Sequence, residues 1–89
     1  MPKAQHAQRY RLLPDLLRQM RQEAGLTQRD LAGKLRVSHV SIHKSETGQR
    51  RVDVAEFMDW CLACDRNPEE AFHQLREARG LKLAVSRRA

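Results

Sequence analysis

The sequence predicts an all-α domain built from five short helices, and three observations support that fold class. A chain of 89 residues is long enough for one hydrophobic core but not for two. Aromatic residues make up only 4% of the chain, so the core must consist mainly of aliphatic side chains, as in packed helices. Apolar residues recur at the three- and four-residue spacing of amphipathic helices, between segments that carry helix-capping residues.

Residues 1–10 are predicted to form a flexible arm, because they contain basic residues but no acid and show little periodicity. The first helix is expected over about residues 11–24, with Pro14 in its first turn, where the missing N–H breaks no hydrogen bond. Gly25 follows at a position that favours left-handed backbone and ends the helix. The apolar stripe expected to enter the core consists of Leu13, Leu16, Leu17, Met20 and Ala24.

Two further helices are predicted close together. Thr27 and Asp30 have the spacing of a capping box and start a helix over about residues 28–35. Ser38 caps the next helix, over about residues 39–47, which is too short and too polar to be stable alone. Two helices joined by so tight a connection form a helix-turn-helix unit. Its residues expected to be buried are Leu31, Ala32, Leu35, Val37 and Ile42.

The remaining chain predicts two more helices and a short tail. A capping box at Asp53 starts a helix over about residues 54–64, and an Asn-Pro pair starts another over about residues 68–79. The expected inner faces are Val54, Phe57, Met58, Cys61 and Leu62 in the first and Ala71, Phe72 and Leu75 in the second. Trp60 lies off this stripe, which indicates a second, partly buried face that a partner subunit could cover. The apolar alternation in residues 81–89 fits a strand paired across a two-fold axis and a frayed terminus equally well.

Charge is distributed unevenly along the chain. Residues 1–52 contain 11 Lys or Arg and 4 Asp or Glu, a net charge of +7, whereas residues 53–77 contain 2 and 7, a net charge of −5, and residues 78–89 add +4. A basic half backed by an acidic half both attracts and orients a polyanion. The chain has no apolar run close to the roughly 18 residues of a membrane span and no signal-peptide pattern. We therefore expect a cytoplasmic protein without a membrane partner.

The potential metal-binding residues do not form a convincing site. Cys61 and Cys64 are spaced as a CxxC pair, but a structural zinc ion requires four ligands, so buried free thiols are expected instead. His39 and His43 lie one helical turn apart without a third ligand. We predict no metal and no cofactor. An enzyme is also not expected, because no nucleophile with a plausible base and no glycine-rich phosphate loop is present.

The segment over about residues 39–47 carries side chains suited to reading DNA. Its expected outer side presents hydrogen-bond donors, an acceptor and an apolar contact, the groups that distinguish base edges in a major groove. These candidate base-contacting residues are His39, Val40, His43 and Lys44. The loop that follows contains two adjacent arginines, Arg50 and Arg51, which are suited to holding phosphate groups.

The segments RQEAGLTQRDLAGKL and VSHVSIHKSETGQRRVD, within about residues 14–72, resemble the Cro/repressor (Xre-type) helix-turn-helix family of bacteria and their phages. The resemblance implies a lambda-repressor-like fold whose third helix lies in the major groove. It places base contacts at His39, Val40 and Lys44, with His43 beside them.

The same resemblance implies roles outside the base-contacting positions. Gln28 corresponds to a glutamine that bonds a phosphate and braces the third helix. Arg21 and Glu46 correspond to an ion pair of the scaffold. Family positions at or near the sugar-phosphate backbone correspond to Ser41, Thr47, Gln49, Arg50 and Arg51.

Three positions in the helix-turn-helix are unusual. Arg36 stands where the family usually has glycine, so the turn either is strained, or has another shape, or holds the arginine against a phosphate, and Arg36 joins the candidate phosphate contacts. Ser45 stands where a large apolar residue is common, which predicts looser packing at the end of its helix. Gly33 lies inside a predicted helix, where we favour an exposed, tolerated glycine over one that another backbone approaches.

Together these observations predict a sequence-specific DNA-binding regulator of transcription. Because one helix reads only a few base pairs, we expect a homodimer that reads palindromic half-sites and represses a promoter by occupying it. The alternative is an antitoxin of the same fold, which binds a toxin partner and its own promoter.

Overall fold

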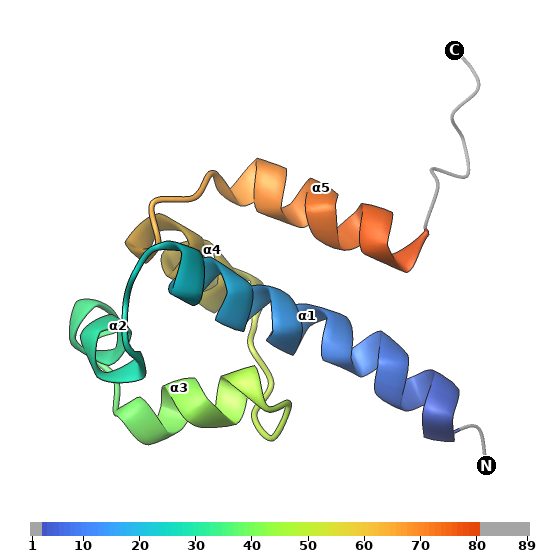
Figure 1. The fold of residues 1–89 in the computed structure, drawn as a ribbon, viewed down its shortest axis with the longest axis horizontal. Coiled ribbons are helices and arrows are strands. Elements are labelled where there is room, and N and C mark those ends of the chain that lie inside the picture. Colours follow the sequence, from blue (N-terminus) through green and yellow to red (C-terminus); the bar gives the residue numbers. More distant parts are fainter. Residues whose placement is uncertain (1–2, 81–89) are drawn as a thin grey trace.

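The computed structural model describes the backbone of residues 3–80 and the side chains from residue 10 onward, and within this part of the chain it contains five helices and no strand (Figure 1). The helices are α1 (Lys3–Glu23), α2 (Gln28–Leu35), α3 (His39–Glu46), α4 (Val54–Ala63) and α5 (Pro68–Arg79). The predicted all-α fold is confirmed. The predicted tail, residues 81–89, lies outside the described residues. None of the described helices is long and apolar enough to cross a bilayer.

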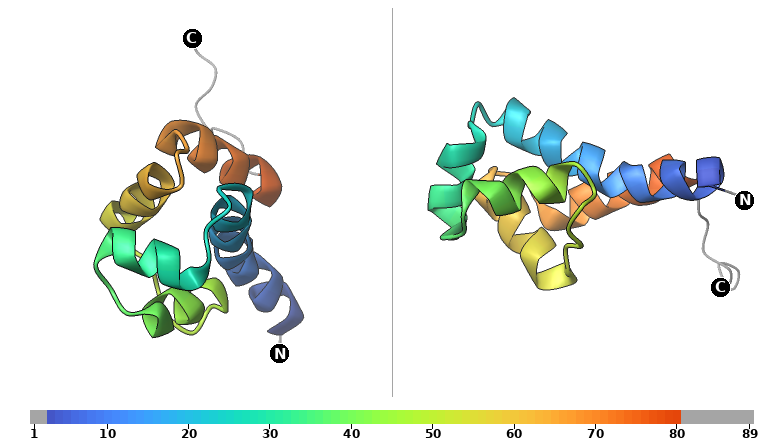
Figure 2. Two further views of the ribbon diagram at one scale, coloured as in Figure 1. Left: turned by 60° about the vertical axis from the view of Figure 1, so that its left-hand side comes forward. Right: turned by 90° about the horizontal axis from the view of Figure 1, so that it is seen from below.

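The five helices enclose one core, with the long helix α1 at its centre. α1 packs against α3 on one side and α5 on the other, while α4 closes the core by packing against α2 and α5. Figure 1 and the left view of Figure 2 both show α3 and α5 on opposite sides of α1. Helix α5 therefore lies on the opposite side of α1 from α3, whereas α4 packs against the helix-turn-helix through α2.

The first helix begins earlier than the sequence pattern predicts. α1 starts at Lys3 and not near residue 11, so the predicted arm over residues 1–10 is wrong for residues 3–10. That segment is rich in Ala, Gln, Lys and Arg, which have high helix propensity even without an apolar stripe. Pro14 consequently lies inside the helix, where proline normally destabilises it. Its buried ring lies close to Gly48 of the loop after α3, so tertiary packing offsets part of that cost.

Helix ends follow the predicted capping chemistry. The Thr27 hydroxyl accepts from the Asp30 N–H at 3.0 Å, and the Asp30 carboxylate accepts from the Thr27 N–H at 2.9 Å. The capping box of α4 and the side-chain caps of α3 and α5 also form. Gly25 has φ +75° after α1, and the next N–H, that of Leu26, donates to the Arg21 carbonyl at 3.1 Å.

The core has a different composition on α4 from the one predicted. Phe57, Trp60, Cys61 and Cys64 are buried, whereas the predicted core residues Val54, Met58 and Leu62 are 74%, 44% and 65% exposed. Both sets have helical spacing, so periodicity alone did not distinguish them. The Trp60 indole decides the choice, because its N–H donates to the Leu17 carbonyl at 3.1 Å and its ring fills the space beneath α1. Trp60 is thus covered by its own chain, and the partner-covered face predicted for it is wrong.

Three other apolar residues differ from prediction, beginning with Ala24, which is exposed just after α1. Phe72 is 60% exposed, because α5 turns Ala71 and Leu75 toward the core instead. Val37 is 44% exposed in the turn before α3. The rest of the core is aliphatic as expected, with Leu16, Leu17, Met20, Leu31 and Ile42 at its centre.

Gly33 offers a test of helix propensity that is free of packing effects. It is exposed in α2, and no heavy atom lies within 4 Å of a Cβ built on it, which agrees with the favoured prediction of a tolerated glycine. We expect Gly33→Ala to raise the free energy of unfolding by roughly 1 kcal/mol, measured by thermal denaturation. The matched change Gly25→Ala should lower it, because Gly25 has a positive φ. Stabilisation by both changes would contradict this explanation.

Candidate nucleic-acid interface

The turn between α2 and α3 contains an arginine whose backbone adopts the left-handed conformation. Arg36 has φ +59° and ψ +44°, and the N–H groups of Arg36 and Val37 both donate to the Ala32 carbonyl. Of the three explanations for an arginine here, a differently shaped turn is therefore excluded. A side chain in this conformation carries a strain of about 1 kcal/mol relative to glycine. The exposed guanidinium makes no hydrogen bond within the described residues.

The strain at Arg36 predicts a stabilising substitution. Arg36→Gly should raise the free energy of unfolding by roughly 0.5–1 kcal/mol, because glycine adopts positive φ without steric cost. Lys34→Gly, two residues earlier in α2, is the matched control and should lower it by about 1 kcal/mol. Chemical denaturation of the three proteins measures both effects. A loss of stability in Arg36→Gly comparable to that of the control would show that the arginine side chain stabilises the turn.

The outer face of α3 remains open. Ser38 starts the helix by accepting from the Ser41 N–H at 3.1 Å, and its hydroxyl also lies 3.1 Å from that of Ser41. The four predicted base-contacting side chains follow, and all are exposed except His39, which is partly exposed. In the part of the chain that the structure describes, none of them takes part in a hydrogen bond or ion pair through its side chain. They are His39, Val40, His43 and Lys44.

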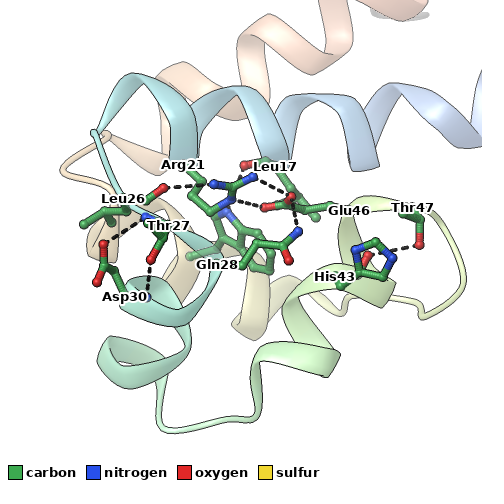
Figure 3. Close-up of polar contacts among 10 residues, drawn as sticks. Leu17, Arg21, Leu26, Thr27, Gln28, Asp30, His43, Glu46 and Thr47 are labelled. Atoms are coloured by element: carbon green, nitrogen blue, oxygen red, sulfur yellow. Dashed lines mark hydrogen bonds and ion pairs between the residues drawn. The ribbon is translucent and has the colours of Figure 1, made fainter.

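The inner side of α3 is fixed by a carboxylate with several partners (Figure 3). Glu46 is 1% exposed, and the Arg21 guanidinium donates to it twice, from Nε at 2.6 Å and from Nη2 at 3.0 Å. The third contact comes from Gln28, whose amide donates to the same carboxylate at 3.1 Å. Arg21 also donates to the Leu26 carbonyl at 2.9 Å, and its hydrogen bond to Glu46 raises its pKa. The predicted Arg21–Glu46 pair is confirmed.

This network joins three helices and removes a negative charge from the surface. Arg21 belongs to α1, Gln28 opens α2 and Glu46 ends α3, so the carboxylate ties the helix-turn-helix to the long helix. Because the Glu46 carboxylate is buried and bonded by a bidentate arginine, its charge is compensated and does not repel phosphate. Gln28 braces α3 as predicted, and its amide is already bonded within the chain.

The loop after α3 separates its two arginines into different environments. Arg50 donates to both oxygens of Glu56, at 2.6 and 3.3 Å, and to the Arg51 carbonyl at 3.2 Å. The charge of Arg50 is therefore balanced by an acid on α4. Arg51 is exposed, and its side chain makes no hydrogen bond within residues 10–80. The Thr47 hydroxyl donates to the His43 carbonyl at 3.0 Å, and Gln49 is exposed.

Sequence reasoning missed the Arg50–Glu56 pair. Glu56 was expected only as the capping partner of Asp53, a role it also fills by accepting from the Asp53 N–H at 3.1 Å. The signal available was an arginine and a glutamate six residues apart on either side of a helix start. That spacing becomes a contact only when the loop folds back onto α4.

The Arg50–Glu56 pair predicts a pH-dependent contribution to stability. Hydrogen bonds from Arg50 lower the pKa of Glu56, so the pair stabilises the fold above the unfolded-state pKa and this stabilisation is lost as pH falls through the folded-state pKa. Glu56→Gln keeps the capping hydrogen bond and should lower the free energy of unfolding at pH 7 by less than about 1 kcal/mol, since the pair is partly exposed. The denaturation curves of parent and variant should converge as the pH falls well below about 4.3, the usual pKa of a glutamate side chain. A difference that persists unchanged at that pH would contradict the assignment.

The two cysteines belong to the core. Cys61 and Cys64 are buried free thiols, as predicted, and burial raises the pKa of Cys64 to about 11. Across the described residues, no three His, Cys, Asp or Glu side chains gather closely enough to hold a metal ion.

Comparison with known proteins identifies the family. Residues 13–72, more than half of the chain, match the family described as a helix-turn-helix domain. The structure of an XRE-family like protein from Pseudomonas syringae pv. tomato str. DC3000 is 38% identical, with a TM-score of 0.75 over 85% of this chain and 93% of that one. The chain belongs to the XRE family. The structure of the clp gene regulator ClgR from Corynebacterium glutamicum shares the fold, with a TM-score of 0.71 and 24% identity over 81% of this chain and 77% of that one. No curated protein sequence matches the chain.

Membership of the XRE family gives the helix-turn-helix its function. The protein is a DNA-binding regulator of transcription, and its helix-turn-helix is the unit formed by α2, the Arg36 turn and α3. The predicted fold and family are both confirmed.

Proposed function

We propose that this XRE-family protein represses transcription by binding a palindromic operator as a homodimer, with α3 of each subunit in the major groove. The observation that carries the proposal is the open face of α3. Its outward side chains are unengaged within the described chain, while its one carboxylate, Glu46, is buried against Arg21. Because its carboxylate is buried, the helix can present hydrogen-bonding groups to base edges without repelling the phosphates beside them.

The contacts divide between base edges and backbone. Base readout belongs to His39, Val40, His43 and Lys44. Phosphate contact belongs first to the exposed side chains without intramolecular partners, Arg36, Gln49 and Arg51. The other residues expected near phosphates, Gln28, Ser41, Thr47 and Arg50, have hydrogen bonds within the chain that fix the position of α3 and its loop.

A homodimer follows from the size of the reading unit. One helix in the major groove reads only a few base pairs, and specificity in a genome requires more. Two symmetric half-sites about one helical turn apart, near 34 Å, double the sequence that is read.

Selection of binding sites from a pool of random DNA duplexes tests the proposal. The full chain should enrich an inverted repeat whose half-sites are separated by about 10 base pairs from centre to centre. The mass of the complex on the enriched duplex, measured by light scattering, should correspond to two chains. A single unrepeated site bound by one chain would overturn the dimer, and the absence of any enriched sequence would overturn specific readout.

The exposed apolar residues of the acidic half favour a second candidate function. Val54, Leu62 and Phe72 are each at least 60% exposed on α4 and α5. Such residues suit a protein partner, as in an antitoxin that binds a toxin and its own promoter. Co-expression with the neighbouring reading frame separates the two functions: rescue of growth from a toxic neighbour supports the antitoxin, and its absence leaves the repressor.

A further inference from the structure

Three sulfur-bearing side chains meet in the core between α1 and α4. The Cys61 thiol of α4 donates to the Met20 thioether of α1, and the two sulfur atoms lie 3.9 Å apart. Cys64 follows Cys61 by about one helical turn, and its N–H donates to the Cys61 carbonyl at 3.1 Å. Met20 and Cys64 line the same surface hollow. Each of the three residues therefore lies beside the other two, and none is more than 4% exposed.

The thioether distinguishes this cluster from the zinc site that a CxxC pair suggests. Within the described residues, no third His, Cys, Asp or Glu joins the two cysteines, so they do not form a zinc site. A methionine sulfur is a ligand for soft ions, and it completes a donor set that consists of sulfur alone. Such a set selects Cu(I) over ions that prefer nitrogen and oxygen ligands. Met20 is 41 residues from Cys61, so the sequence spacing could not connect them.

We propose that Met20, Cys61 and Cys64 bind one Cu(I) ion in a three-sulfur site. Metal–sulfur bonds of about 2.3 Å at trigonal angles place the sulfur atoms roughly 4.0 Å apart, close to the 3.9 Å between Cys61 and Met20. On binding, each thiol releases its proton to solvent and its thiolate forms one bond to the ion. The thioether donates a lone pair and stays neutral. The ion remains Cu(I), so the step needs no oxidant or reductant.

The surroundings of the cluster favour an ion with a high affinity for sulfur and balance its charge. Burial raises the pKa of Cys61 and raises that of Cys64 to about 11, so both thiols are protonated at neutral pH without an ion. An ion that bonds sulfur weakly does not displace these protons. Two thiolates and one monovalent ion have a net charge of −1. Arg66 lines the hollow beside Cys64, and its positive charge favours the thiolate form of both cysteines.

Anaerobic titration of the full, reduced chain with Cu(I) tests the site. The ion is added as its acetonitrile complex in competition with a coloured Cu(I) chelator, whose absorbance reports the affinity. We expect one Cu(I) per chain and, by X-ray absorption, three sulfur neighbours at about 2.3 Å. Zn(II) should bind at least about a hundredfold more weakly, because two thiolates are only half of its ligand set. Two sulfur neighbours, or one ion shared by two chains, overturns the proposal.

Two variants and a matched control locate the ligands. Met20→Leu removes the thioether with little change in volume, so the chain should stay folded by circular dichroism. It should weaken Cu(I) binding at least about tenfold and leave two sulfur neighbours. Met58→Leu is the control and should change neither, because Met58 is 44% exposed on the outer side of α4. Cys64→Ala removes one thiolate and should abolish tight binding. If Cys64→Ala does not fold, Met20→Leu decides, and equal affinities of the two methionine variants overturn the assignment.

The site also predicts an effect of Cu(I) on stability. The unfolded chain keeps the two cysteines close together but separates them from Met20, so the folded chain has one ligand more for the ion. Cu(I) should therefore raise the melting temperature of the parent and of Met58→Leu more than that of Met20→Leu. An equal rise in all three proteins, or a fall in the parent, overturns the three-sulfur site. None of these measurements involves DNA, so their outcome is independent of the proposed function.

Discussion

Glu46→Ala is expected to destabilise the protein strongly. It leaves Arg21, whose side chain is only 12% exposed, without the carboxylate that accepts two of its hydrogen bonds, and it also removes the partner of Gln28. Breaking a buried ion pair by removing one partner costs about 3–5 kcal/mol. For a domain of this size, that lowers the melting temperature by at least about 12 °C. Thermal denaturation followed by circular dichroism measures the shift.

Glu23→Ala is the matched control for this prediction. Glu23 also carries a carboxylate paired with an arginine, but the pair with Arg66 spans 3.6 Å and the glutamate is 56% exposed. Exposed pairs contribute about 1 kcal/mol or less, so this variant should stay within a few degrees of the parent. Equal shifts for Glu46→Ala and Glu23→Ala would contradict the assignment of Glu46 as the link between three helices.

Lys44→Ala is expected to have the largest effect on sequence preference. Lys44 is exposed on α3 and its side chain makes no hydrogen bond within the described chain, so its ammonium group is free to contact a base edge. Loss of a good base contact costs about 1–3 kcal/mol, or roughly 5- to 150-fold in affinity for the selected operator. Affinity for unrelated DNA should fall much less. Fluorescence anisotropy on the operator and on a scrambled duplex measures the two affinities.

Arg51→Ala should behave differently from Lys44→Ala. Because Arg51 is exposed in the loop after α3 and its charge is not balanced within the described residues, we expect it to contact phosphate. Its loss should weaken binding to both duplexes alike and reduce the slope of log affinity against log salt by about 0.9. Arg79→Ala, on the opposite side of the molecule at the end of α5, is the control and should change neither. Equal loss of preference in the Lys44 and Arg51 variants would refute the division into base and backbone contacts.

Helices α2 to α5 begin at the predicted residues, because local capping chemistry decides where each one starts. α2 and α5 have the predicted bounds, and α3 and α4 each end one residue earlier than predicted. Their capping residues bond to N–H groups only two or three positions away, so the sequence spacing already contains the geometry. The start of α1 was misplaced because it was inferred from apolar periodicity, whereas residues 3–10 are helical without an apolar stripe.

The features of the candidate site also differ in how far the sequence could predict them. The outer face of α3 was predictable, because residues one helical turn apart share a face. The Arg21–Glu46 pair joins residues 25 positions apart and was predicted only through the family resemblance. The different environments of Arg50 and Arg51 could not be predicted, because they arise when the loop brings one arginine against α4. The hollow lined by Leu35, Ile42 and Trp60 likewise exists only where α2, α3 and α4 meet.

The sequence is sufficient to predict four of the helices, their caps and the helix-turn-helix, because these depend on hydrogen bonds and spacing within a few residues. The face of α4 that is buried depends instead on contacts between distant parts of the chain. Trp60 is 3% exposed and bonds a carbonyl 43 residues away, while Val54, with equally good helical spacing, is 74% exposed. Periodicity shows that a helix has an apolar side, but the side that enters the core is chosen by the shape and hydrogen-bonding groups of the helices that pack against it.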